Sequence, residues 1–297
     1  MQLTDMPVAT AQAFKRSMKL MGNRFEITVV AEDEAWAQQR IDEAVAEISR
    51  IEKLLTTFKE DSQTNAINRN AGVAPVQVDK EVFDLVYRAN KISQLTQGAF
   101  DISYGSIDKS LWNFDTTMKS LPDPELARRS VHLINYRNVI LDEKNCTVFL
   151  KNKGMRIGFG GIGKGYAAEM ARILLRQKGV TSGIVNASGD LTAWGKQPNG
   201  EKWTIGIADP DSAHHPFSYM AISEMSVATS GNYEKFVLIG DKKYSHTIDP
   251  NTGMPVSGIK SVTVICPNAE IADAMATPIT VMGVKAGLVL VNQVKGL

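Results

Sequence analysis

Helical and strand-like patterns occupy different parts of this chain of 297 residues, and this segregation is what most constrains its fold. Apolar residues recur at helical spacing in residues 34–58, 79–98 and 122–134, whereas short strand-like runs dominate from residue 138 to residue 266. A regular alternation of strand and helix, which would predict a parallel sheet, is not present. We therefore predict an α+β fold, a single compact domain with largely antiparallel sheets packed against helices.

The ends of the predicted elements carry ordinary start and stop residues. Asp79 and Asp123 precede helical patterns as N-caps, Pro124 occupies a first helical turn, and Gly98 ends the second helix. A strand is predicted at residues 20–31, a strand–turn–strand–turn–strand run at 138–159, and late helices at 268–283 and 285–294. We expect residues 1–17 to be a tail or linker and residues 18–297 to form the domain.

Composition excludes several classes of protein. The 33 Lys and Arg residues balance 32 Asp and Glu residues, so no basic surface for nucleic acid is expected. The two cysteines, Cys146 and Cys266, lie far apart in apolar runs and are predicted to be core residues rather than a metal or redox pair. No uninterrupted apolar run approaches the roughly 18 residues of a membrane helix, and the N-terminal stretch lacks a signal peptide's apolar region.

A glycine-rich stretch, RIGFGGIGKGYAAEMA at residues 156–171, matches two phosphate-binding patterns in part. Gly158, Gly160 and Gly163 spell G-x-G-x-x-G, and Lys164 extends this to G-x-x-x-x-G-K. A P-loop would need Ser or Thr where this chain has Gly165. Placed between a strand and a helix, the loop would offer helix amides to an anion, although a tight turn without a ligand fits the motif equally well.

Asp273 and Thr277 lie four residues apart in the helical pattern at 268–283 and therefore share a face. Asp273 is flanked by apolar residues, and a buried charge without a partner is costly, so a bound cation would explain it. Magnesium prefers oxygen ligands of this kind. A solvent-facing Asp beside a Thr bonded to its own helix is the simpler reading of the spacing alone.

Eight segments in a fixed order cover about residues 18–284 and read MGNRFEI, TFKEDSQTNAIN, GAFDIS, GGIGKGYAAE, VNASGDLTAWG, VATSGNYEKF, YSHTIDPNTGMPV and SVTVICPNAEIADAMAT. In this order they resemble the ApbE-type FAD:protein FMN transferases. The resemblance implies an ApbE-like, T-fold-related domain. It also implies transfer of FMN from FAD to a Ser or Thr hydroxyl of a target protein with Mg²⁺, forming a phosphoester and releasing AMP.

The resemblance also implies site residues. Residues matching FAD-contacting positions are Met21, Phe58, Ala99, Phe100, Asp101, Lys164 and Thr247. Residues matching the metal ligands are Asp273, Thr277 and the backbone carbonyl of Gly161. Two departures stand out, because the family usually has Asp where this chain has Gly158 and Ala where it has Gly163.

Of the four histidines, His246 is the candidate general base. It lies in the YSHTIDP motif beside Thr247, and an imidazole titrates near neutral pH. His214 and His215 are predicted to be solvated, and His132 lies in a helical pattern. Asp273, acting through a water, is the alternative proton acceptor. The same site would also serve FAD hydrolysis to FMN and AMP.

Two other functions have less support from the sequence than FMN transfer. A non-catalytic FAD-binding protein would fit the Gly158 departure, and an NAD-dependent dehydrogenase would rest on G-x-G-x-x-G alone. By resemblance the protein works in the periplasm or on the outer face of the cytoplasmic membrane, often as a lipoprotein, although no lipid-anchor cysteine stands near residue 1. The expected acceptor is a membrane redox subunit.

Overall fold

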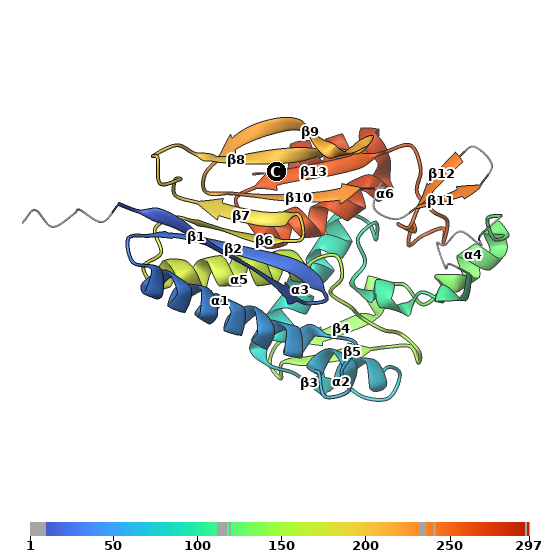
Figure 1. The fold of residues 1–297 in the computed structure, drawn as a ribbon. Coiled ribbons are helices and arrows are strands. Elements are labelled where there is room, and N and C mark those ends of the chain that lie inside the picture. The colour runs from blue at the N-terminus through green and yellow to red at the C-terminus, as the bar shows by residue number, and fades with distance from the viewer. Residues whose placement is uncertain are drawn as a thin grey trace, which may run out of the picture.

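A six-stranded antiparallel sheet forms the centre of the molecule (Figure 1). The computed structural model describes residues 10–111, 118, 120–231, 236–239, 242–294 and 296. In spatial order the strands are β1 (Gln12–Leu20), β2 (Asn23–Ala31), β6 (Gly183–Ala187), β7 (Asp190–Trp194), β10 (Met225–Gly231) and β13 (Ser261–Cys266). Every pairing among the described strands is antiparallel, as predicted.

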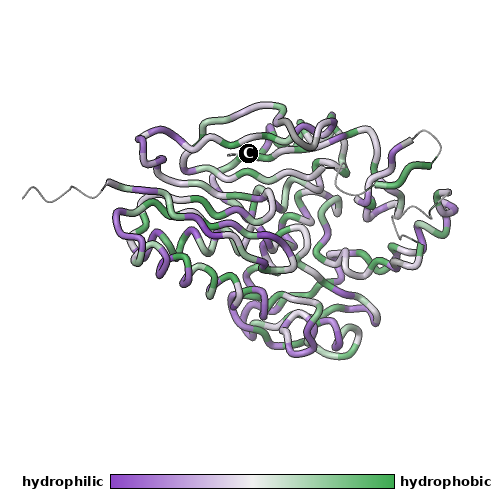
Figure 2. Tube along the Cα trace, in the orientation of Figure 1, coloured by the Kyte–Doolittle hydropathy of each residue, from purple (hydrophilic) through white to green (hydrophobic). Residues whose placement is uncertain are grey.

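Three helices pack on one face of this sheet, namely α1 (Glu34–Leu55), α5 (Gly163–Gln177) and α6 (Ala269–Gln293). Helix α1 begins because the Asp33 carboxylate accepts a hydrogen bond from the Trp36 amide, and its buried stripe includes Ile41, Ile48 and Leu55, as the periodicity predicts. Hydrophobic and hydrophilic residues alternate along α1 in Figure 2, which is the pattern of a helix with one buried face.

The opposite face of the sheet is covered by the hairpin of β8 (Trp203–Asp209) and β9 (Ser212–Ile222). Trp203 and Ile222 pack there against Leu191, Ala193 and Val227. A smaller sheet contains β3 (Val76–Gln77), β4 (Val139–Asp142) and β5 (Thr147–Leu150), and a separate hairpin contains β11 (Phe236–Ile239) and β12 (Lys242–Ser245).

The remaining helices are α2 (Gln63–Arg69), α3 (Lys80–Leu95) and α4 (Pro124–Ser130), with short 3-10 turns η1 (Ile102–Ser106), η2 (Lys109–Leu111) and η3 (Tyr136–Asn138). Asp79 and Asp123 are the N-cap residues of α3 and α4, as predicted, and Gly98 follows α3 with a positive φ of 84°. Helix α2 was not predicted. It begins at a Ser62 cap and lacks a long apolar stripe.

Three sequence predictions need correction. Residues 12–17 belong to β1 rather than to a tail, because Phe14, Arg16 and Met18 alternate with more exposed residues in a half-buried edge strand. Residues 155–159 form no strand. Their backbone is bonded instead by other segments: the Ile157 amide donates to Asn68 Oδ1 over 2.8 Å, and the Gly158 amide donates to the Ile102 carbonyl over 3.1 Å.

The third correction concerns Cys146, which lies half-buried in a turn with a φ of 48° while Cys266 is buried. The side chains of His214 and His215, and residues 232–235 of one family segment, lie outside the described part of the chain.

Helix α6 is long and apolar enough to cross a membrane by composition alone. Its first half is buried in the domain core, where Ala272, Ala274 and Met275 contact the main hydrophobic cluster. The backbone leaves helical geometry at Gly283, with a φ of 82°, so the two predicted late helices are present as two helical segments. We therefore interpret α6 as a core helix, and its first half positions the site.

Candidate active site

Helices α5 and α6 meet at Gly165, the residue that follows Lys164 in the glycine loop. A Cβ atom at Gly165 would lie 2.2 Å from the Ala269 carbonyl oxygen and 2.6 Å from the Cβ of Asp273. Only glycine fits between the two helices at this distance. The contact explains why the loop lacks the Ser or Thr of a P-loop, and it places Asp273 against the start of α5.

Asp273 caps the N-terminus of α5 from the neighbouring helix. The N-cap residue of α5, Ile162, makes no side-chain capping bond, whereas the Gly165 amide donates to Asp273 Oδ2 over 2.8 Å. Asp273 is buried, with 7% of its surface exposed. Burial first, and then the charge of Asp190, raise the pKa of Asp273, while Lys164 and the first amides of α5 act in the opposite direction. Positive charge nearby would favour its ionised form.

This cap favours the tight turn without a ligand over the alternative that the first amides of α5 bind a phosphate. The Gly163 amide donates to the Phe159 carbonyl over 2.7 Å, the Tyr166 amide donates to the Ile162 carbonyl over 2.9 Å, and the Gly165 amide is taken by Asp273. A phosphate would have to displace these bonds. The anion-binding capacity of this helix start is used within the fold.

A polar cavity of about 140 Å³ opens beside the cap. It gathers side chains from α5, β7, β10, the segment after β12, and α6. Its lining residues are Gly160, Lys164, Asp190, Thr229, Ser230, Gly231, His246, Asp273, Ala276 and Thr277. Four side chains predicted from three separate motifs, those of Lys164, His246, Asp273 and Thr277, therefore meet around one space.

Lys164 forms an ion pair with Asp190 inside this cavity. The side chain of Asp190 is 6% exposed and that of Lys164 is 27% exposed. Asp190 opens β7 after a tight hairpin turn in which Ser188 and Gly189 both have positive φ, 58° and 102°. The Gly189 amide donates to Asn186 Oδ1 over 2.8 Å, which fixes that turn.

The donor atoms at the cavity suit a hard divalent cation. Asp273 and Thr277 supply a buried carboxylate and a hydroxyl from one face of α6. Within the described residues, the Thr277 hydroxyl makes no hydrogen bond to another protein group. A carboxylate held in the interior and a hydroxyl without a protein partner are what a magnesium ion would use.

Gly161, the third predicted metal ligand, lies in the glycine loop, which two of the predicted FAD residues approach. A Cβ at Gly161 would come within 3.4 Å of the Phe100 ring, and a Cβ at Gly163 would come within 3.6 Å of the methyl group of Met21. The Met21 amide is held by Glu52 Oε2 at 2.9 Å. The structure thus brings Met21 and Phe100 to the glycine loop, although neither lines the cavity.

The other predicted FAD residues are less closely grouped. Phe58 is 97% exposed, which leaves its ring free to stack on a flat ligand, and Ala99 is buried. Thr247 follows His246, and its amide donates to Ser245 Oγ over 3.0 Å. None of these three residues lines the cavity, and their contact with FAD stays a prediction.

Asp101 holds its own segment of the fold. Its carboxylate accepts hydrogen bonds from the Ser103 amide at 2.8 Å, the Ser103 hydroxyl at 2.6 Å and the Tyr136 amide at 2.9 Å. Burial raises the pKa of Asp101, and these bonds oppose the rise. The side chain is therefore occupied within the protein, and an FAD contact at this residue stays a prediction.

Sequence reasoning missed Asp190, Thr229 and Ser230 as cavity residues. Asp190 lies within the VNASGDLTAWG segment, from which no site residue was predicted. The available signal was the Ser188–Gly189 pair that precedes it, because such a pair favours a two-residue hairpin turn. The residue after the turn then begins a strand at the end of the sheet. Thr229 and Ser230 sit in a strand whose motif gave no chemical hint.

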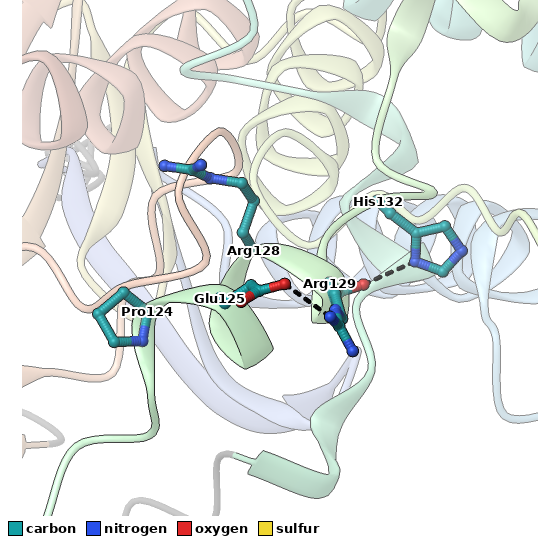
Figure 3. Close-up of a pocket in the computed structure, with 5 residues that line it drawn as sticks. All are labelled: Pro124, Glu125, Arg128, Arg129 and His132. Carbon is teal, nitrogen blue, oxygen red and sulfur yellow. Dashed lines mark hydrogen bonds and ion pairs between the residues drawn. The ribbon is translucent and has the colours of Figure 1, made fainter.

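A second, larger hollow of about 660 Å³ lies along α4 (Figure 3). It is lined by Pro124, Glu125, Arg128, Arg129 and His132. Glu125 pairs with Arg129, and His132 Nδ1 lies 2.6 Å from the Arg129 carbonyl oxygen. No residue predicted for catalysis, FAD or metal lines it, so the smaller polar cavity is the better candidate despite its size.

A model of the ApbE family matches residues 21–297 of this chain. The chain belongs to the ApbE family. The fold agrees with solved ApbE structures. It superposes on the ApbE protein of Thermotoga maritima with a TM-score of 0.84 at 30% identity, covering 95% of this chain and 91% of that one. The apo flavinyl transferase ApbE of Pseudomonas stutzeri gives a TM-score of 0.83 at 25% identity, with 97% and 90% covered.

Curated ApbE relatives are named FAD:protein FMN transferase. The one from Klebsiella pneumoniae strain 342 is 34% identical over 284 residues, which is 95% of this chain and 86% of the relative. The one from Treponema pallidum is 28% identical over 97% of this chain and 84% of the relative. The family predicted from the ordered motifs and the α+β fold predicted from the segregated helical and strand-like patterns are thus confirmed.

Against this ApbE background, Gly158 can be examined in space. A Cβ at Gly158 would meet only the Thr57 methyl group, at 4.0 Å. Its φ is not in the left-handed region, so the position tolerates a side chain. Nothing in the described fold requires glycine there, in contrast to Gly165.

Proposed function

We propose that this chain is an FAD:protein FMN transferase, which moves FMN from FAD to a Ser or Thr hydroxyl of a target protein. The observation that carries the proposal is the polar cavity in which Lys164, His246, Asp273 and Thr277 meet. The cavity combines a positively charged side chain, a base and hard oxygen donors for a metal ion within one small space. Phosphoryl-type transfer requires groups of these kinds. The names of the relatives give the same reaction.

In the proposed step, His246 accepts the proton of the acceptor hydroxyl. The hydroxyl oxygen attacks the phosphorus of the FMN half of the pyrophosphate. The bond from that phosphorus to the bridging oxygen breaks, and AMP leaves with the electron pair. Lys164 steadies the negative charge that develops on the phosphate oxygens. The products are a protein–FMN phosphoester and AMP.

We propose that Asp273, Thr277 and the Gly161 carbonyl hold magnesium. When bound, the ion would neutralise the pyrophosphate charge and favour departure of AMP. The fit of this donor set rests on the buried Asp273 carboxylate and on the Thr277 hydroxyl described above. Asp273 also organises the start of α5, which keeps Lys164 at the cavity.

The flavin end of FAD is assigned to the apolar side of the glycine loop. Met21 and Phe100 lie against Gly163 and Gly161, and the exposed Phe58 ring could stack on the isoalloxazine or the adenine. Ala99, Asp101 and Thr247 complete the set by resemblance. We further propose that the enzyme acts in the periplasm or on the outer membrane face, on a membrane redox subunit.

The deciding experiment incubates the protein with FAD, Mg²⁺ and a purified acceptor fragment that carries a candidate Ser or Thr. Intact mass spectrometry of the acceptor and chromatography of AMP are read together. We expect an acceptor heavier by one FMN, one AMP per transfer, and no reaction with EDTA. AMP with free FMN and an unmodified acceptor would instead indicate FAD hydrolysis.

His246→Ala tests the base, with His132→Ala as the matched control outside the cavity. We expect transfer to fall by about 10²–10⁴-fold in His246→Ala, the usual contribution of a general base, while FAD still binds. His132→Ala should transfer FMN normally. A near wild-type rate in His246→Ala would remove the assigned base.

A further inference from the structure

The cavity contains two buried carboxylates and a lysine. Asp190 and Asp273 both line it. Lys164 lies on the first turn of α5, next to Gly165, whose amide donates a hydrogen bond to Asp273. In the structure the Lys164 ammonium pairs with Asp190. The charges of Asp190 and Lys164 both act on Asp273, in opposite directions, which shows that the three groups share one electrostatic environment.

The three groups differ in how far they can move. Asp190 is fixed by the hairpin turn at Ser188–Gly189 and by its pairing with Ala187 across β6 and β7. Asp273 is fixed by its bond to the Gly165 amide and by the tight helix contact there. Lys164 has four flexible methylene groups and is the only one of the three whose charge can change partner.

A buried carboxylate is costly without a cation, so it attracts a neighbouring ammonium. If Lys164 settled on Asp273, its ammonium would compete with a divalent cation for the same oxygen atoms. Asp190 offers Lys164 an alternative carboxylate that is almost fully buried and therefore weakly screened by salt. The pair with Asp190 leaves Asp273 open on its cavity side.

We propose that Asp190 is a positioning residue, which holds Lys164 away from Asp273 so that Asp273 can bind a divalent cation. The inference rests on the metal assignment within the proposed function. It assigns to Asp190 a role in metal affinity without direct coordination. It also explains why a carboxylate is placed beside a lysine that must later contact a phosphate.

The test measures Mn²⁺ binding to the FAD-free protein by electron paramagnetic resonance, so it does not depend on activity. Asp190→Asn should weaken Mn²⁺ binding by roughly 10–100-fold, the usual cost of losing a residue that orients a metal ligand. The double variant Asp190→Asn, Lys164→Met should recover most of the affinity, because the competing ammonium is gone. Asp211→Asn, which breaks an exposed carboxylate–lysine pair with Lys260, is the matched control and should bind as wild type.

A crystal structure of Asp190→Asn separates positioning from a general loss of negative charge. We expect the Lys164 ammonium on Asp273 in that structure, and we expect the loss of affinity to persist at about 0.5 M salt, since buried pairs are weakly screened. Lys164 remaining beside residue 190, unchanged Mn²⁺ affinity in Asp190→Asn, or no recovery in the double variant would each overturn the inference. Thermal unfolding confirms that both variants fold.

The metal assignment is tested separately with Asp273→Asn. Loss of Mn²⁺ binding in Asp273→Asn together with wild-type binding in Asp190→Asn would overturn the role of Asp190 alone. Mn²⁺ binding that survives Asp273→Asn would overturn the metal site in the proposed function, and the role of Asp190 with it.

Discussion

Helices α4 and α5 begin in opposite ways. Helix α4 carries its own cap, because the Asp123 carboxylate accepts hydrogen bonds from the Glu125 and Leu126 amides at 2.8 and 3.3 Å. Helix α5 has the apolar Ile162 at its N-cap and takes its cap from Asp273 of α6, 108 residues further along the chain. A local cap only starts a helix, whereas a distant one also fixes where a carboxylate stands.

This difference teaches where function can be placed. At α4 the capping carboxylate belongs to an exposed turn and does one task. At α5 the capping carboxylate is buried, faces a cavity with Lys164 and His246, and is oriented by a backbone amide. Orientation by a fixed amide is what a metal ligand needs. Substitutions at Asp273 and at Gly165, which lie on the two sides of the α5–α6 contact, test whether helix capping and metal binding can be separated.

The largest effect is expected at Asp273. Asp273→Ala removes cap and metal ligand together, so FMN transfer should fall at least 100-fold and stability by about 1 kcal/mol, the usual cost of a lost cap. Asp273→Asn keeps an oxygen that can accept a hydrogen bond from the Gly165 amide but loses the negative charge of the carboxylate. We expect Asp273→Asn to unfold near the wild-type denaturant midpoint while transferring no FMN.

Urea unfolding and AMP release, measured on both variants, check this separation. Equal loss of stability in Asp273→Ala and Asp273→Asn would mean that the charge, not the hydrogen bond, supports α5. Normal transfer by Asp273→Asn would contradict its assignment as a metal ligand.

The next effect in size concerns the space between the helices. Gly165→Ala would place a Cβ 2.2 Å from the Ala269 carbonyl oxygen, so α5 and α6 must separate. Overpacking of this kind costs about 1–3 kcal/mol. Gly160→Ala is the matched control in the same loop, since nothing lies within 4 Å of its added Cβ. Chemical denaturation should show a lower midpoint for Gly165→Ala only.

Equal stability of the two alanine variants would show that the helices can adjust without cost. Gly165→Ala should also weaken Mn²⁺ binding, because Asp273 would shift with α6. A destabilised Gly165→Ala variant with wild-type metal affinity would uncouple the helix contact from the site.

The contrast between α4 and α5 also marks how far sequence could lead. The Asp123 cap and the buried stripe of α1 depend on neighbours within a few residues, so cap rules were sufficient for the start of α4 and periodicity was sufficient for α1. The cap of α5 and the Lys164–Asp190 pair join residues 108 and 26 positions apart. Such pairs depend on how helices and strands are placed in space, which local patterns do not encode.

The same limit applies to the glycine loop, which the sequence left open as an anion site or a tight turn. The glycine loop has the composition of a phosphate cradle, but Phe159, Ile162 and Asp273 already accept hydrogen bonds from the first amides of α5. Ordered motifs across the chain did predict Lys164, His246, Asp273 and Thr277, which the fold brings to one cavity. The position of Asp190 at the cavity could be recognised only from the geometry of its hairpin.

A smaller effect is expected at Gly158, in the segment that leads into α5. The position has room for a side chain and no need for positive φ, so Gly158→Asp should fold as wild type. If the usual family Asp contributes one hydrogen bond to FAD, the FAD dissociation constant should fall about fivefold, corresponding to about 1 kcal/mol. Flavin fluorescence titration measures the change, and Gly158→Asn separates the hydrogen bond from the charge. An unchanged constant in both variants would mean that FAD passes this position without contact.

The smallest functional effect is expected at the α4 end of the comparison. Asp123→Ala removes a cap that serves only its own helix, so it should cost about 1 kcal/mol of unfolding free energy. FAD binding, Mn²⁺ affinity and FMN transfer should stay within twofold of wild type, because Asp123 does not line the cavity. Asp123→Ser restores a capping oxygen and should recover the stability. A clear loss of transfer in Asp123→Ala, reversed in Asp123→Ser, would show that α4 supports acceptor binding. The hollow beside Arg128 and Arg129 would then be the surface to examine.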